Sequence, residues 1–216
     1  DLGCGTGRDV FLLAQLVGET GEVVGVDMTD NQLAVALEHE TWHADRFGYA
    51  KPNTRFLKGY IEALDQLDLE AGSFDLIISN CVINLSTDKP AVFAGVRHLL
   101  KPDGVMHFAD VYAERAVPED LRTDPVLYGE CLAGALAWSD FLAIAEDTGF
   151  DAPELVDHRP LAISDDALIE KLDGLKFVSA TVELRPAPAN DAPRQETGDP
   201  FTLPSPHAPS SGSCCG

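Results

Sequence analysis

Two hydrophobic periods alternate along the first half of the chain. Short apolar runs predict strands at 23–26, 54–58, 74–79 and 105–109, and apolar residues at helical spacing predict helices at 10–17, 29–47 and 90–100. The run at 74–79 is nearly all apolar, so we expect both faces of that strand to be buried. Strands and helices that alternate at this rhythm predict an α/β fold with a doubly wound parallel sheet. Ligands of such a sheet bind at the carboxyl ends of its strands.

Three helix and turn signals give the boundaries of these elements. Thr29, followed three residues later by Gln32, forms a capping-box signature at the start of the second helix. The turn signal Lys-Pro-Asp-Gly at 101–104 separates the third helix from the strand at 105–109. Further along the chain, Ser139 is the expected N-cap of a helix that runs to about Thr148.

The rhythm changes after Asp110. Strands are predicted at 154–163 and 177–184, with a helix near 165–172 between them. We expect residues 116–185 to form a smaller α+β substrate module that lies over the ligand edge of the domain formed by residues 1–115.

The last segment, 186–216, is rich in proline and serine. It has no apolar periodicity. We therefore expect a disordered tail, which carries the adjacent cysteines Cys214 and Cys215 near its end.

The chain opens with a glycine-rich turn, Asp-Leu-Gly-Cys-Gly-Thr-Gly-Arg. A dinucleotide fingerprint needs a glycine where this chain has Arg8, which weakens a pyrophosphate interpretation. Twenty positions after Gly7 an apolar strand ends on Asp27, an acid able to accept both hydroxyls of a ribose. The pattern suits a cofactor that has a nucleoside and a positive charge but no phosphate, and S-adenosylmethionine has these properties.

Other strand ends should bring further residues to the same edge. Glu62 follows the strand at 54–58, and we favour a cofactor contact for it over the alternative of a merely solvated acid. The expected cofactor-binding residues are Asp1, Gly3, Gly5, Thr6, Gly7, Asp27, Met28, Ile61, Glu62 and Asn80. Only Asp1 and Leu2 precede the glycine turn, so we expect a fragment whose first strand is truncated.

Composition excludes several classes of partner. The chain has 15 Lys and Arg against 36 Asp and Glu, a net charge of -21 that repels nucleic-acid backbones and anionic membrane surfaces. No apolar run approaches the length of a membrane span, and no secretory signal is visible. Five cysteines without zinc-ribbon spacing argue against a disulfide scaffold and favour a reducing cytoplasm.

Each cysteine has a functional and a structural interpretation. Free cysteine is among the most buried residue types, so Cys81 or Cys131 taken alone would be core filler. Cys4, inside the glycine turn, is interpreted as filler. Cys214 and Cys215 either capture a thiophilic ligand and transfer it to the interior of the protein, or they have no role in binding. Trp138 is expected to pack rather than to contact substrate.

Two cysteine contexts carry a family resemblance. They are Ser-Asn-Cys-Val-Ile-Asn-Leu at 79–85 and Tyr-Gly-Glu-Cys-Leu-Ala-Gly-Ala-Leu-Ala-Trp at 128–138, together with the ending Gly-Ser-Cys-Cys-Gly at 212–216. The chain resembles the arsenite methyltransferases from Asp1 to about Arg185. The resemblance implies a Rossmann-like class I methyltransferase fold and transfer of methyl groups from S-adenosylmethionine to trivalent arsenic, a detoxification reaction. It also implies that Cys81 and Cys131 bind the arsenic as catalytic ligands.

The chemistry of arsenic agrees with this ligand set. Trivalent arsenic is soft and thiophilic, so thiolates are its natural ligands. Its lone pair is the nucleophile, and no proton leaves the nucleophilic atom, which means that the site needs no general base. The family places a further arsenic-binding cysteine upstream of the glycine turn. Cys214, Cys215 or a small thiol is the expected substitute, and an external thiol reductant such as thioredoxin or glutathione is the expected partner.

Two other functions remain open at this stage. The cofactor could serve another small-molecule acceptor with a carbon, oxygen or nitrogen nucleophile, in which case activity would survive loss of Cys81. Alternatively, the chain is a metalloid-binding fragment without turnover.

Overall fold

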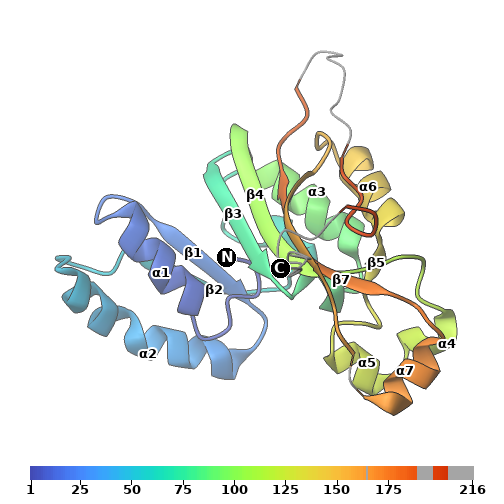
Figure 1. The fold of residues 1–216 in the computed structure, drawn as a ribbon. Coiled ribbons are helices and arrows are strands. Elements are labelled where there is room, and N and C mark those ends of the chain that lie inside the picture. The colour runs from blue at the N-terminus through green and yellow to red at the C-terminus, as the bar shows by residue number, and fades with distance from the viewer. Residues whose placement is uncertain (164, 189–196, 204–216) are drawn as a thin grey trace, which may run out of the picture.

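The computed structural model describes residues 1–163, 165–188 and 197–203, and the arrangement of its elements is drawn in Figure 1. The elements in chain order are α1 (Arg8–Val17), β1 (Val23–Asp27), α2 (Asp30–Phe47), β2 (Thr54–Lys58), η1 (Ile61–Gln66), β3 (Phe74–Asn80), η2 (Ile83–Leu85), α3 (Lys89–Leu99), β4 (Leu100–Ala113), α4 (Glu119–Arg122), α5 (Pro125–Gly129), β5 (Leu136–Ala137), α6 (Trp138–Asp147), β6 (Glu154–Pro160), α7 (Asp166–Leu172) and β7 (Phe177–Leu184). The predicted α/β alternation of the first half is confirmed.

One residue joins the two parts of the sheet. β1 pairs in parallel with β2, and β3 pairs in parallel with β4. Leu2 lies between these pairs and forms parallel bridges to Val26 and to Ser79. Its amide donates to the carbonyl oxygen of Ile78 at 2.9 Å, and the next amide, of Gly3, donates to the carbonyl oxygen of Val26 at 2.8 Å. The sheet order is therefore β2, β1, Leu2, β3, β4.

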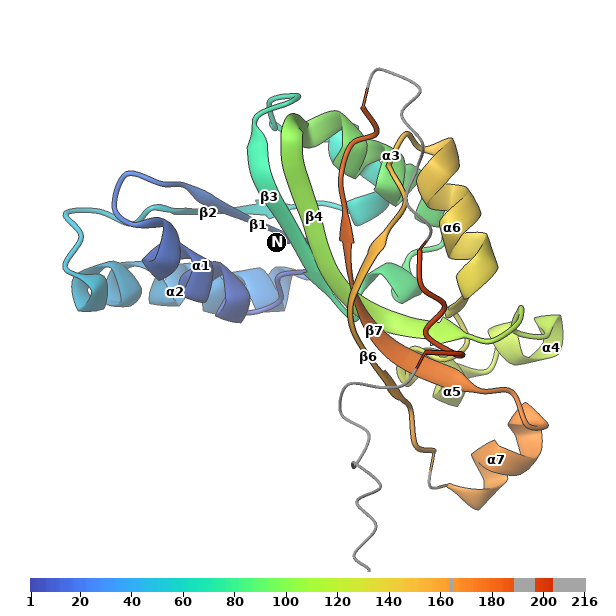
Figure 2. The same cartoon turned by 45° about the horizontal axis from the view of Figure 1, so that its top comes forward.

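The edge strands β7 and β6 make the sheet mixed. β7 pairs antiparallel with β4, and β6 pairs antiparallel with β7. Residues 116–185 thus contribute β6, β7 and the two-residue β5, which pairs with the end of β4, to the same sheet that residues 1–115 begin (Figure 2). The remaining helices α4, α5 and α7 gather beyond the carboxyl end of β4 (Figure 1). The division at residue 115 stays a prediction.

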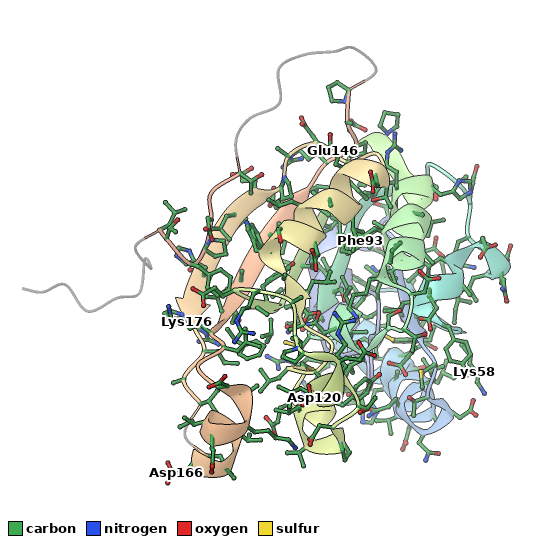
Figure 3. The ribbon with its side chains drawn as sticks, turned by 90° about the vertical axis from the view of Figure 1, so that its right-hand side faces the viewer. Lys58, Phe93, Asp120, Glu146, Asp166 and Lys176 are labelled. Carbon is green, nitrogen blue, oxygen red and sulfur yellow. The ribbon has the colours of Figure 1, made fainter. Side chains whose placement is uncertain are left out.

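The main core lies between the sheet and the helix pair α3 and α6. Rings of Phe93, Phe108 and Phe141 pack with centroids 5.8 to 5.9 Å apart, and all three side chains are buried. Figure 3 shows Phe93 inside the molecule, with Glu146 of α6 at one end and Asp166 of α7 at the other. Smaller clusters lie under α1 and α2 and under α4, α5 and α7. Each helix therefore covers apolar surface of the sheet or of the end of β4.

The expectation that β3 is buried on both faces is wrong at Leu76, which is 40% exposed. Beside it, a groove of about 490 Å³ runs between β1 and β3, lined in part by Val24, Leu76 and Ile78. Leu2 bridges the two strands only at their carboxyl ends, so their amino-terminal halves are apart. Leu76 is exposed because it faces this groove.

Three predictions from local sequence signals differ from the structure. Thr29 is the N-cap of α2, but its side chain makes no capping hydrogen bond. Ser139 lies inside α6, whose N-cap is Ala137, because Leu136 and Ala137 pair with the end of β4 and fix the start of the helix. The turn predicted at 101–104 is instead part of β4, which begins at Leu100. Gly104 lets the backbone lie close to the carbonyl oxygen of Phe74 at the irregular start of the β3–β4 ladder.

The structure describes two parts of the predicted tail, residues 186–188 and 197–203, and both contact the folded chain. The disorder of the tail stays a prediction. Pro186 forms a bridge to Phe150, and Phe201 packs against the main core. Asp199 holds the turn around Phe201, because its carboxylate accepts the amide of Phe201 at 2.9 Å. Apolar surface at Phe201 explains the docking. Residues 189–196 and 204–216, with Cys214 and Cys215, lie outside the described residues.

We expect the substitution Phe201→Ala to lower the free energy of unfolding by roughly 1–2 kcal/mol, because a partly buried ring would leave the core. Chemical denaturation of the full chain measures this. Leu16→Ala is the control, since Leu16 is 80% exposed and should change stability by less than about 0.5 kcal/mol. Equal stability of the Phe201 variant and the parent chain would mean that the docked turn contributes nothing.

Candidate active site

The glycine turn and Asp27 form one hydrogen-bonded unit. The carboxylate of Asp27 accepts the amide of Gly5 through Oδ2 at 2.9 Å and the amide of Thr29 through Oδ1 at 2.8 Å. The amides of Gly3 and Cys4 both donate to the carbonyl oxygen of Val26. The acid at the end of β1 is therefore fixed against the turn, with its remaining lone pairs available to a ligand.

Each glycine of the turn has a positive φ, and they differ in surroundings. A Cβ on Gly3 would lie 2.5 Å from the side chain of Val82, and one on Gly7 would lie 2.8 Å from the ring of Phe56. A Cβ on Gly5 would meet nothing nearer than Gln32 Oε1 at 3.8 Å. Close packing against neighbouring side chains thus requires glycine at positions 3 and 7, whereas the backbone of Gly5 faces open space.

The other predicted cofactor residues lie near the same edge. Asp27 and Asn80 are the last residues of β1 and β3, with Leu2 between these strands. Glu62, in η1, accepts the hydroxyl of Ser86 at 3.3 Å. Of the remaining predicted residues, Ile61 is buried, Asp1 and Glu62 are half-buried, and Thr6, Met28 and Asn80 are exposed. Their role in binding stays a prediction.

The two candidate thiols lie on loops that face each other. Cys81 opens the first thiol loop (81–86), and Cys131 lies in the second thiol loop (128–134). The thiol of Cys131 lies 3.7 Å from the carbonyl oxygen of Cys81, to which it donates a weak hydrogen bond. The amide of Cys81 donates to the carbonyl oxygen of Ala109 at 2.8 Å, which ties the first loop to β4.

Both cysteines have a strained backbone. Cys81 has φ 55° and Cys131 has φ 59°, and Asp173 is the other non-glycine residue with positive φ among the residues that the structure describes. The left-handed conformation costs an L-residue roughly 1–2 kcal/mol relative to the right-handed one. Strain of this kind collects at functional sites, and sequence patterns carry no signal for it.

Burial and a neighbouring acid keep these thiols protonated. The pKa of Cys131 is raised to about 11, mainly by burial and to a smaller extent by the charges of Asp110, Cys81 and Glu130, in that order. The pKa of Cys81 is raised first by burial and then by the charge of Asp110. Neither thiol is therefore a thiolate at neutral pH before a ligand binds.

Sequence reasoning missed two residues that hold the thiol loops. Asp110 is 2% exposed, and burial raises its pKa to about 6 although the amides of Val111 and Asn84 donate to its carboxylate. Asn84 is 4% exposed, and its side-chain amide donates to the carbonyl oxygens of Val111 at 2.7 Å and Cys131 at 3.5 Å. Asp110 follows a predicted strand, the signal used for Glu62. Asn84 lies in the cysteine context at 79–85 that carries the family resemblance, but no local pattern indicates its role.

The remaining cysteine and tryptophan agree with their structural interpretations. Cys4 is 7% exposed in the small core under α1 and α2, and burial raises its pKa to about 11. Trp138 packs on Tyr112 and Phe141 at ring distances of 4.9 and 5.1 Å. Among the described residues, no group of three or more His, Cys, Asp or Glu side chains could hold a metal ion.

Comparison with known proteins decides the family. The profile described as "Methyltransferase domain" matches residues 1–149. The chain belongs to this methyltransferase family. Its α/β sheet is that of the class I methyltransferases. The matched range contains the glycine turn, Asp27 and both candidate thiols. Within the described part of this methyltransferase, no helix has the length and apolar character needed to cross a membrane.

Several relatives of this methyltransferase carry a more specific name. The arsenite methyltransferase of Aquipseudomonas alcaligenes is 56% identical over 184 residues, which are 85% of this chain and 53% of the relative. The arsenite methyltransferase of Homo sapiens is 42% identical over 85% of this chain and 49% of the relative. The chain thus spans about half the length of the curated relatives it matches.

A solved structure agrees with the sequence comparison. An arsenic (III) S-adenosylmethionine methyltransferase from Chlamydomonas reinhardtii superposes with a TM-score of 0.83 at 47% identity, covering 88% of this chain and 63% of that one. The YcgJ protein from Bacillus, at 20% identity and a TM-score of 0.61, shares the fold.

We expect alkylation of Cys131 by iodoacetamide to increase with pH up to about 11, rather than to level off near the ordinary thiol pKa. Asp110→Asn removes a negative charge and should shift the profiles of Cys81 and Cys131 to lower pH. Peptide mass spectrometry reads each site. Asp103→Asn, an exposed acid near the other end of β4, is the control. A Cys131 profile that levels off near pH 8.5 would contradict the expectation.

Proposed function

We propose that this methyltransferase methylates arsenite with S-adenosylmethionine, giving methylated arsenicals in a detoxification reaction. The observation that carries the proposal is the pair of strained cysteine loops, with the thiol of Cys131 3.7 Å from the carbonyl oxygen of Cys81. Two thiols on loops that contact each other suit a soft, three-coordinate metalloid better than a carbon, oxygen or nitrogen acceptor. The names of the relatives support the same substrate.

The residues around the glycine turn fit the cofactor. Asp27 offers carboxylate lone pairs to ribose hydroxyls, and Gly5 leaves space for a ligand next to it. Arg8, the basic residue of the turn, is exposed and pairs with Asp9 at 3.9 Å. The turn thus offers an acceptor and no inward-facing cation, which suits a ligand without phosphate. When bound, S-adenosylmethionine supplies an electrophilic methyl group.

Arsenite would be captured by exchange of its hydroxyl groups for thiols. At each cysteine a sulfur–arsenic bond forms and an arsenic–oxygen bond breaks, and the thiol proton leaves with the hydroxide as water. Protonated thiols are therefore competent for capture, which agrees with the raised pKa of Cys81 and Cys131. The arsenic lone pair needs no general base, and the task of the two loops is alignment.

The third arsenic ligand and the reductant belong to the proposal as well. Cys214, Cys215 or a small thiol would supply a third sulfur. Methylation removes two electrons from arsenic, and restoring the trivalent state oxidises two thiols to a disulfide. An external thiol reductant, thioredoxin or glutathione, would return those electrons, which places the reaction in a reducing cytoplasm.

We expect Cys81→Ser and Cys131→Ser each to abolish arsenite methylation while cofactor affinity is kept. Serine keeps the shape of the side chain, but its hydroxyl is a harder ligand than a thiol. Arsenic speciation after incubation with arsenite, reduced glutathione and labelled cofactor is the measurement, and calorimetry with the cofactor is the control.

A second pair of variants separates ligand loss from strain. Cys81→Gly and Cys131→Gly relieve a left-handed backbone, so they should melt no lower than the serine variants and should be equally inactive. Methylation at the parent rate by any single variant would remove that thiol from the site.

We expect Asp27→Asn to weaken cofactor affinity about tenfold or more, because a charged acceptor of ribose hydroxyls becomes a neutral one. Arsenite binding should change little. Asp30→Asn is the control, since Asp30 lies three residues away and pairs with Lys58 instead. Unchanged cofactor affinity in the Asp27 variant would exclude this acid from the cofactor site.

A further inference from the structure

The two thiol loops are in unusually close backbone contact. A Cβ built on Gly134 would lie 1.9 Å from the carbonyl oxygen of Asn84. The φ of Gly134 is not positive, so space rather than backbone conformation requires glycine at this position. The neighbouring atom is backbone and cannot rotate away, and alanine would push the loops apart by at least about 1 Å.

The side chain of Asn84 also stabilises the contact between the two thiol loops through hydrogen bonds. Its amide donates to the carbonyl oxygens of Val111 and Cys131, and its backbone amide donates to Asp110. One buried residue thereby links the first thiol loop, the end of β4 and the backbone of Cys131 itself. At the rim, Tyr128 adds a hydrogen bond to the carbonyl oxygen of Leu85 at 2.6 Å.

We propose that Asn84 and Gly134, together the loop clamp, are positioning residues that set the separation of the Cys81 and Cys131 thiols. The inference rests on the proposed function for its ligand, arsenite, but the separation is a property of the protein alone. A chelating site needs its donor atoms at a fixed distance, and a displacement of about 1 Å can cost roughly 100-fold in a positioned reaction. The hydrogen bonds of Asn84 go to Asp110 and to the backbone of Val111 and Cys131, which are not among the predicted cofactor residues.

The first measurement uses no arsenic. Dibromobimane becomes fluorescent when its two arms alkylate neighbouring thiols, so the rate of bridging reports their separation. All variants carry Cys214→Ser and Cys215→Ser, which removes the adjacent thiols of the tail. We expect the parent of this series to be bridged between Cys81 and Cys131, and Gly134→Ala to be bridged about tenfold more slowly or worse.

Gly129→Ala is the matched control, because a Cβ on Gly129, in the same loop, would meet nothing within 4 Å. It should be bridged at the parent rate. Asn84→Ala keeps the carbonyl oxygen opposite Gly134 but loses both side-chain hydrogen bonds, and it should show a smaller reduction. Cofactor affinity and the melting temperature report whether each variant is folded. Should Gly134→Ala fail to fold, Asn84→Ala still tests the clamp.

The second measurement is arsenite affinity by equilibrium dialysis. It should be reduced in Gly134→Ala and Asn84→Ala and kept in Gly129→Ala. Parental bridging and parental arsenite affinity in a folded Gly134 or Asn84 variant would overturn the clamp and leave the proposed function intact. Conversely, a parent chain that is bridged but never methylates arsenite would defeat the proposed function, while slower bridging in the clamp variants would still support the clamp.

Discussion

The backbone of Leu2 and Gly3 is the constraint on which both the sheet and the site depend. Leu2 bridges β1 and β3, and Gly3 carries the chain from that bridge into the glycine turn, against the side chain of Val82. Val82 follows Cys81, so the glycine turn, where we propose that the cofactor binds, and the loop that bears a thiol are packed directly on each other. In the proposed reaction, the distance between methyl donor and acceptor would thereby be set by backbone packing next to the middle of the sheet.

Cys81 and Cys131 share two features, a strained backbone and a raised thiol pKa. Partial burial together with the charge of Asp110 raises the pKa of both thiols, although Cys81 is exposed. A protonated thiol is a poor nucleophile toward alkylating agents and disulfides. It can still exchange with the hydroxyl groups of a neutral metalloid acid, because the proton leaves as water. The raised pKa values would therefore slow alkylation of these thiols without preventing capture of the proposed substrate.

Local patterns predicted what depends on local chemistry. The glycine turn, Asp27 and the alternation of strands and helices follow from glycine spacing and apolar periodicity, and they were predicted. Asn84, Asp110 and Gly134 act through contacts between segments 26 to 50 positions apart, such as Asn84 with Asp110 and Gly134 with Asn84, and periodicity contains no such information. Ser139 failed as a cap for the same reason, because β5 fixes the start of α6 through its pairing with β4.

Strand β4 carries both thiol loops. The first loop follows β3 and the second precedes β5, and both of these strands pair with β4. The loops are therefore both joined to strands that pair with β4, which makes the sheet a common frame for the gap between them. In the proposed arsenic site, such a frame would favour, among thiophilic ions, the one whose bonds to sulfur span the gap between the two thiols without distorting the loops. Ionic size, more than affinity for sulfur, would then decide which metalloid the protein accepts.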